Sequence, residues 1–416
     1  MRNLAFLTSF YNLNSTLSIS NDLFKHLAKN FENIYVIDTD KLIFFPKFAK
    51  ISYGEKKKIE KINQKIPLNL HLIKPNNKKE FIEFAKKNDL LVISNFTKDF
   101  FALKILFLLK KLNIPQIRIH NIGASGMDAH IKITNPIRLL NYHLFQNLFK
   151  KIISPILILL GLIPRTDIYF HSKKKELNDT KKSFFKSFLL KHGLLFAKEY
   201  KLINSKAYDA LLVNKIKIEK KYIVHLDAEM NGRHEIETRG ILKAEDVKAH
   251  YYHLRLFLNK LSKDFNKPVV VCVHPNIKRR DVNQLRKSDL LKGFKIVQNQ
   301  TRYYIYKSFI VTSFETSAVG DAAILKKNMI GLWSKYMDIN QIKHSKTFPK
   351  AIGYLRINLE NFKYNKQQLS KILKKNIPKY NNYINNYHCH KKNILGIDLV
   401  SSIIKKRYNI RKKINL

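Results

Sequence analysis

The sequence predicts an α/β protein of two doubly wound, Rossmann-like domains that face a cleft, with a basic helical insertion between them. Short apolar segments alternate with amphipathic helical segments in both halves of the chain, the pattern of a parallel sheet covered on both faces. The chain has 416 residues, 45% of them hydrophobic, which is enough for two or three domains with cores of their own.

The first half predicts one such unit, an N-terminal domain over residues 1–133. The segment 18–31, for example, places Leu23, Phe24 and Leu27 at helical spacing. The complete set comprises strands at 3–10, 33–40, 69–75, 89–96 and 115–123, and helices at 18–31, 77–88 and 98–114.

The pattern changes over residues 134–221, where lysine-rich helical stretches predict an insertion or bridge. The most apolar stretch, "IISPILILLGLIP" at 152–164, is interrupted by Pro155 and Gly161. It is shorter than the roughly 20 residues that a membrane-spanning helix needs. We therefore expect a buried or interfacial helix there.

A second unit is expected over residues 222–358, followed by a basic helical tail at 359–416. Its elements are strands at 221–232, 267–276, 293–300, 309–313 and 329–334, and helices at 244–265, 301–308 and 318–328. The run "VVVCV" reads as a strand buried on both faces.

Charge is the outlying property of the composition. The chain has 78 Lys and Arg against 31 Asp and Glu, a net charge of +47. Richness in Lys, Asn and Ile is typical of an AT-rich genome and accounts for part of the excess. The remainder predicts an anionic partner: nucleic acid, acidic lipid headgroups, or a nucleotide substrate.

Cysteine use and the N-terminal segment bear on the compartment. Cys272 and Cys389 form neither a disulfide framework nor a zinc-ligand spacing, and "HCH" at 388–390 is a poor ligand set. We read the first 20 residues as a strand and turn and expect no secretory signal. A reducing cytoplasm fits best.

Two motifs follow strands of the second unit, at the edge where open parallel sheets bind ligands. In "VHPN", Pro275 keeps the preceding backbone extended, so that His274 projects from the strand end and can donate to a phosphate oxygen. The alternative is a histidine that only closes the strand end.

The second motif is "TSFETSAVG", where a strand becomes a helix. Hydroxyls of Ser313, Thr316 and Ser317 beside free N–H groups suit a phosphate or a ribose. The alternative is a plain helix N-cap, which needs one hydroxyl. Glu315 does not suit phosphate and is expected to face ribose or solvent.

The order strand, His-Pro, strand, short helix, strand, Ser/Thr-rich turn and small-residue helix resembles the C-terminal nucleotide-binding domain of GT-B glycosyltransferases. It is similar to bacterial surface-polysaccharide enzymes: sialyl- and polysialyltransferases, capsule-type transferases and CDP-glycerol glycerophosphotransferases. The resemblance covers residues 222–333. The usual serine pair is adjacent, whereas this chain has two Ser/Thr pairs separated by Phe314 and Glu315.

The resemblance implies a set of donor-nucleotide contacts. In those families the corresponding groups hold the phosphate of a donor that is usually CMP- or CDP-activated. Here the implied donor-site residues are His274, Pro275, Asn276, Ser313, Glu315, Thr316 and Ser317.

A catalytic base is also expected, because inverting transfer must remove the proton of the acceptor hydroxyl. Asp128, after a strand end and the Gly123–Gly126 loop, is the first choice, and His130 is the reserve. The alternative is an aspartate in a loop turn.

Two further polar groups follow expected strands and are candidates for donor or acceptor contacts. A charged surface loop is the alternative reading of the second group. They are Asn12, Asn14 and Ser15 after the first strand, and Asp227, Glu229 and Arg233 at the start of the second unit.

The leading hypothesis is an inverting, metal-independent glycosyltransferase. It would transfer a sugar from a CMP-linked, sialic-acid-like donor to a capsule or lipooligosaccharide acceptor, without a cofactor, at the inner face of the cytoplasmic membrane. A CDP-glycerol-type polyol phosphate transferase and a UDP-GlcNAc epimerase-like enzyme are the alternatives. A nucleic-acid-binding protein is disfavoured, because no zinc finger, RNP motif or basic-aromatic platform is present.

Overall fold

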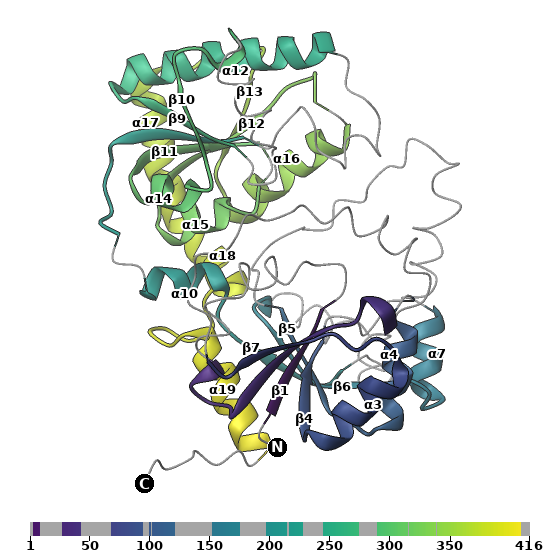
Figure 1. Cartoon of the computed structure of the whole chain (residues 1–416). Coiled ribbons are helices and arrows are strands. Elements are labelled where there is room, and N and C mark those ends of the chain that lie inside the picture. The colour runs from purple at the N-terminus through teal and green to yellow at the C-terminus, as the bar shows by residue number, and fades with distance from the viewer. Residues whose placement is uncertain are drawn as a thin grey trace. The chain divides into compact units, whose positions relative to one another are not determined.

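The computed structural model resolves the chain into two compact units (Figure 1). Unit 1 consists of Met1–Asn121, Ile137–Asn204 and Lys391–Leu416, and unit 2 of Ile122–Pro136 and Ser205–His390. The structure describes residues 3–8, 27–42, 68–94, 100, 102–120, 152–174, 197–213, 216–227, 244–273, 289–314, 316–337 and 339–408.

Unit 1 contains a parallel sheet with the strand order β3-β2-β1-β4-β5-β6-β7. The strands are β1 (Asn3–Thr8), β2 (Asn33–Asp38), β3 (Leu70–Ile73), β4 (Leu90–Ile93), β5 (Gln116–His120), β6 (Thr166–His171) and β7 (Ala197–Leu202). The helices include α3 (Lys78–Lys87), α4 (Leu103–Lys111), α7 (Ser154–Leu159) and α19 (Gly396–Arg407).

Helices cover both faces of this sheet. On one face, Ala5 and Val92 pack with Phe81 of α3 and Ile105 of α4. On the other face, strand residues such as Leu4 and Ile168 pack with α19 through Val400 and Ile404. The alternation of buried side chains along each strand therefore fills two separate cores, as a doubly wound sheet requires.

Strands β6 and β7 lie within residues 134–221, for which helices were expected, and that expectation is wrong at these two strands. They extend the first sheet at the β5 edge. The strand β7 reads "AKEYKL"; Lys198, Glu199 and Lys201 are charged, and most of its side chains are half-exposed. Charged side chains are typical of an edge strand, and they hide its strand character in the sequence.

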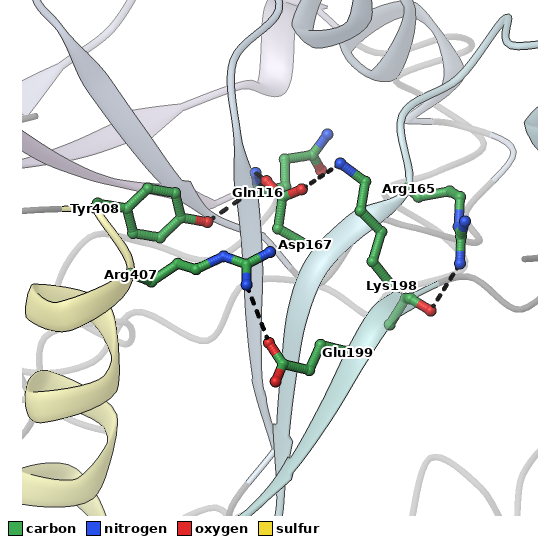
Figure 2. Close-up of polar contacts among 8 residues, drawn as sticks. Gln116, Arg165, Asp167, Lys198, Glu199, Arg407 and Tyr408 are labelled. Atoms are coloured by element: carbon green, nitrogen blue, oxygen red, sulfur yellow. Dashed lines mark hydrogen bonds and ion pairs between the residues drawn. The ribbon is translucent and has the colours of Figure 1, made fainter.

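The last helix, α19, belongs to unit 1 and is not a free tail. Asp167 at the start of β6 accepts hydrogen bonds from Lys198 Nζ (2.6 Å) and Tyr408 Oη (3.5 Å), as Figure 2 shows. Arg407 lies 3.6 Å from Glu199 of β7. These contacts attach the end of α19 to the amino ends of the sheet strands, opposite the edge where ligands bind in such sheets.

Unit 2 contains a second parallel sheet, with the order β10-β9-β8-β11-β12-β13. The strands are β8 (Tyr222–Leu226), β9 (Val269–Val273), β10 (Lys295–Gln298), β11 (Ser308–Ser313), β12 (Asn328–Trp333) and β13 (Leu355–Asn358). The helices include α10 (Lys206–Val213), α12 (Ala244–Phe265), α14 (Thr301–Tyr306), α15 (Val319–Ile324), α16 (Ile339–Ile352), α17 (Lys366–Asn376) and α18 (Tyr380–Tyr387).

Helices α12 and α17 cover one face of this sheet, and α14, α15 and α18 cover the other. The long α12 spans the predicted residues and buries Tyr251, Leu254 and Leu258 at helical spacing. It is followed by Asn266 in the left-handed conformation (φ 50°), which asparagine tolerates better than most residues. The predicted fold class of two doubly wound α/β sheets is confirmed.

Candidate functional site

The candidate site lies at the carboxyl ends of β8 and β11 in unit 2. These strands are parallel neighbours, with Thr312 opposite His225 and Ser313 opposite Leu226. The chain continues from β8 to β9 and β10 on one side of the sheet, and from β11 to β12 and β13 on the other. The order therefore reverses between β8 and β11, and ligands of open α/β sheets bind outside the carboxyl ends of strands at such a switch point.

A buried histidine cluster supports these strand ends on the α12 side. His225 Nδ1 lies 2.9 Å from Thr312 Oγ1, which links β8 to β11. His250 Nδ1 of α12 lies 2.8 Å from Ser334 Oγ, directly after β12. The ring of Phe314 lies between the two imidazoles, at centroid distances of 5.1 and 4.7 Å. The cluster thus joins the ends of three strands to one helix.

Both histidines of the cluster are neutral at neutral pH. Burial, and to a smaller extent the neighbouring His250, lowers the pKa of His225 to about 3. Burial likewise lowers the pKa of His250 to about 3. The two imidazoles therefore supply hydrogen-bonding and packing but no positive charge for a phosphate group.

Asp227 directly follows β8 and is buried, with 4% of its surface exposed. Its backbone N–H donates to the carbonyl of Cys272 on β9 (3.0 Å), and its Oδ2 accepts from Tyr251 Oη of α12 (3.1 Å). The carboxylate is thus engaged in holding α12 against the strand end. Its contacts are those of a residue that shapes the site.

The hydroxyls of the "TSFETSAVG" motif differ in accessibility. Ser313 is 1% exposed and lies on the α15 side of the sheet, facing Tyr354, without a well-formed hydrogen bond among the described residues. Thr316 Oγ1 accepts from the N–H of Ala318 (3.3 Å). Of these three hydroxyl-bearing residues, Ser317 is the exposed one.

The start of α15 also differs from a simple side-chain cap. The helix begins at Val319, and its cap residue, Ala318, has no side chain to donate or accept. The turn before it is closed by backbone bonds, from Gly320 N to Ser317 O (3.0 Å) among others. The motif therefore contains hydroxyls beyond those that the helix itself uses.

The other predicted site residues lie outside the described residues. Strand β9 ends at Val273, immediately before His274, and β1 ends at Thr8, ahead of the asparagine-rich segment. The residues in question are His274, Pro275, Asn276, Glu315, Glu229 and Arg233 for unit 2, Asn12, Asn14 and Ser15 after β1, and Asp128 and His130 for the catalytic base.

The sequence reading missed the histidine cluster. His225 occupies an apolar strand and His250 an apolar helix face, so both read as ordinary core positions. One feature of the sequence could have identified the cluster: His225 within a predicted strand and His250 near the start of the predicted helix that follows it. Among the described residues, no group of three His, Cys, Asp or Glu side chains is placed to hold a metal ion.

The comparisons with known proteins bear on this architecture. No protein-family model matches the chain, and no curated protein matches it in sequence. A solved structure of a variant of the wall teichoic acid polymerase TagF aligns with a TM-score of 0.53 at 13% identity, over 98% of this chain and 89% of that one. The chain has a GT-B-like fold.

Other structures align over similar lengths of the GT-B-like chain. The UDP-GlcNAc 2-epimerase of Methanocaldococcus jannaschii has a TM-score of 0.48 and 13% identity, over 97% of this chain and 99% of that one. MnaA of S. aureus, solved with UDP, has a TM-score of 0.47 and 13% identity, over 99% of this chain and 98% of that one.

Proposed function

We propose that this chain is a glycosyltransferase that binds a nucleotide-activated sugar at the carboxyl ends of β8 and β11. The observation that carries the proposal is the coincidence of the switch point with the exposed hydroxyl of Ser317. The residues that follow the neighbouring strand β9, His274 to Asn276, supply a further donor to phosphate. A nucleotide offers what these groups bind: phosphate oxygens and ribose hydroxyls.

The proposed chemistry is inverting transfer. The acceptor hydroxyl attacks the anomeric carbon of the sugar, the bond from that carbon to the phosphate oxygen breaks, and the nucleotide leaves with the electron pair. Asp128, with His130 in reserve, takes the acceptor proton. His274, Thr316 and Ser317 stabilise the charge that develops on the leaving phosphate.

The donor is proposed to be a CMP-linked, sialic-acid-like sugar, as the sequence resemblance implies. The acceptor is a surface glycan or glycolipid of the capsule or lipooligosaccharide type. The net charge of +47 supports a peripheral position on the anionic inner face of the cytoplasmic membrane. Across the part of the chain that the structure describes, no helix is both long and apolar enough to cross a bilayer.

A second candidate is a CDP-glycerol-type polyol phosphate transferase, which the structural similarity to TagF favours. In that reaction the acceptor hydroxyl attacks phosphorus and CMP leaves. An epimerase acting on UDP-GlcNAc is a third reading of the same fold. Product analysis with CMP-sugar, CDP-glycerol and UDP-GlcNAc separates them, since only the epimerase converts its substrate without an acceptor.

Calorimetric titration with CMP, CDP and UDP tests the site. We expect one nucleotide to bind, and His274→Ala and Ser317→Ala each to weaken its binding by about 1.5–3 kcal/mol, the contribution of a hydrogen bond to a charged group. Ser370→Ala is the matched control, because Ser370 is a partly exposed serine whose hydroxyl donates to the Lys366 carbonyl of its own helix, α17 (2.8 Å). Binding that is unchanged in both site variants would contradict the assignment.

A further inference from the structure

Exposed isoleucine and leucine side chains gather on α7 and on the residues directly before and after it. Ile156 and Leu159 lie three residues apart on α7, which places them on one side of the helix, and the other members flank the helix in the chain. We call this set the α7 face. Its members and their exposed fractions are Ile152 (52%), Ile156 (48%), Leu159 (59%), Leu160 (66%) and Leu162 (46%).

The opposite side of α7 already has its packing partner. Ser154 and Ile158 are buried, and Ile158 and Ile163 pack against Leu103 and Leu106 of α4. Figure 1 shows α4 and α7 side by side. The α7 face is therefore a second apolar surface on a helix whose first is satisfied, and clustered exposed apolar residues of this kind mark interaction sites.

The stretch of sequence that contains the α7 face is basic. Lys150 and Lys151 directly precede Ile152, and Arg165 follows Pro164. The packed helix α4 ends in Lys110 and Lys111. Between residues 100 and 166, Asp128 is the only acidic residue in the sequence. An apolar surface within a basic segment matches an anionic lipid surface in both respects.

We propose that the α7 face inserts into the boundary between headgroups and acyl chains of an anionic bilayer, and that the basic character of this part of the chain favours anionic headgroups. The helix has 6 residues, so it lies in the interface and does not span. A second copy of this chain is a less suitable partner for the α7 face, because a symmetric contact would bring two basic surfaces together. The inference rests on the proposed function in one respect: docking on a bilayer would bring the enzyme to a glycolipid acceptor.

Co-sedimentation with vesicles tests the proposal. Wild-type protein is expected to bind vesicles of phosphatidylglycerol and phosphatidylcholine, and the double variant Ile156→Ser with Leu160→Ser to bind about tenfold more weakly. The matched control is Leu68→Ser, which alters a fully exposed leucine of the same unit outside the α7 face. Circular dichroism verifies that each variant is folded.

Three results would overturn the docking proposal. The double variant binds the anionic vesicles as wild type does, or Leu68→Ser loses as much binding, or analytical ultracentrifugation shows a wild-type dimer that the double variant abolishes while vesicle binding persists. Calorimetry on the same preparations keeps the two proposals apart. If the double variant still binds nucleotide, the donor site is intact, whatever the vesicles show. If the wild-type protein binds vesicles but no nucleotide, that result contradicts the proposed function and leaves the docking proposal standing.

Discussion

At the residue scale, the buried histidines and the motif hydroxyls have separate tasks. His225 and His250 hold strand ends and a helix together through Thr312 and Ser334. Ser317 remains exposed at the same sheet edge. A site that combines buried, fully packed supports with a few exposed polar groups positions its ligand contacts on rigid elements.

The histidine cluster predicts loss of stability in mild acid. The unfolded histidines have a pKa near 6.5, and the folded pKa of each is lowered to about 3, so the stability they contribute is complete above pH 6.5 and falls as the pH is lowered toward 3. The relation between pKa and stability gives a loss of about 2 kcal/mol per histidine by pH 5. Urea unfolding at pH 7.5 and pH 5 measures it.

A variant localises this effect. His250→Asn keeps a polar partner for Ser334 and removes the titrating ring, so the difference in unfolding free energy between the two pH values should shrink. His71→Asn, at an exposed histidine of unit 1, should leave the difference as in wild type. Equal stability of the wild-type protein at both pH values would show that the cluster is not buried in its neutral form.

At the element scale, α19 is the feature that the sequence concealed. Its residues read as part of a helical tail, and they form a helix, but the sheet that they cover is the first one, far away in sequence. Local pattern predicts that a segment is helical and which face is apolar, and it carries no information about which sheet receives that face. The same limit explains why the sequence did not predict β13 and β7. Both are edge strands, β13 short and β7 charged, and they are recognised as strands by the neighbours with which they pair.

A close backbone contact predicts how sensitive α19 is to substitution. A Cβ added at Gly396 would clash with the backbone carbonyl oxygen of Asn204, whose side chain also donates to the carbonyls of Lys391 and Ile394 (both 2.6 Å). Gly396→Ala should therefore destabilise the protein by about 2 kcal/mol, since neighbouring backbone must shift. Thermal unfolding measures this, with Ser402→Ala at an exposed position of α19 as the control. An unchanged midpoint in Gly396→Ala would contradict the packing of this helix start.

At the scale of the whole molecule, the sequence predicted the fold class. It predicted the site only in part. Alternating strands and helices identified both doubly wound units, because each strand run is apolar and each helix is amphipathic. The switch point needed the strand order, which no local pattern contains. Ser313 shows the limit for single residues. Its position at the end of a strand was predicted correctly, but its burial depends on Tyr354, which lies 41 positions further along the chain.

The central claim is that unit 2 binds a nucleotide at the carboxyl ends of β8 and β11. Hydrogen exchange with and without a saturating nucleotide, chosen by the calorimetric titration, tests it directly. The account predicts slower exchange in peptides covering residues 222–232, 269–278 and 308–320, and unchanged exchange at 396–408. Exchange that no nucleotide alters, or protection confined to unit 1, would contradict it.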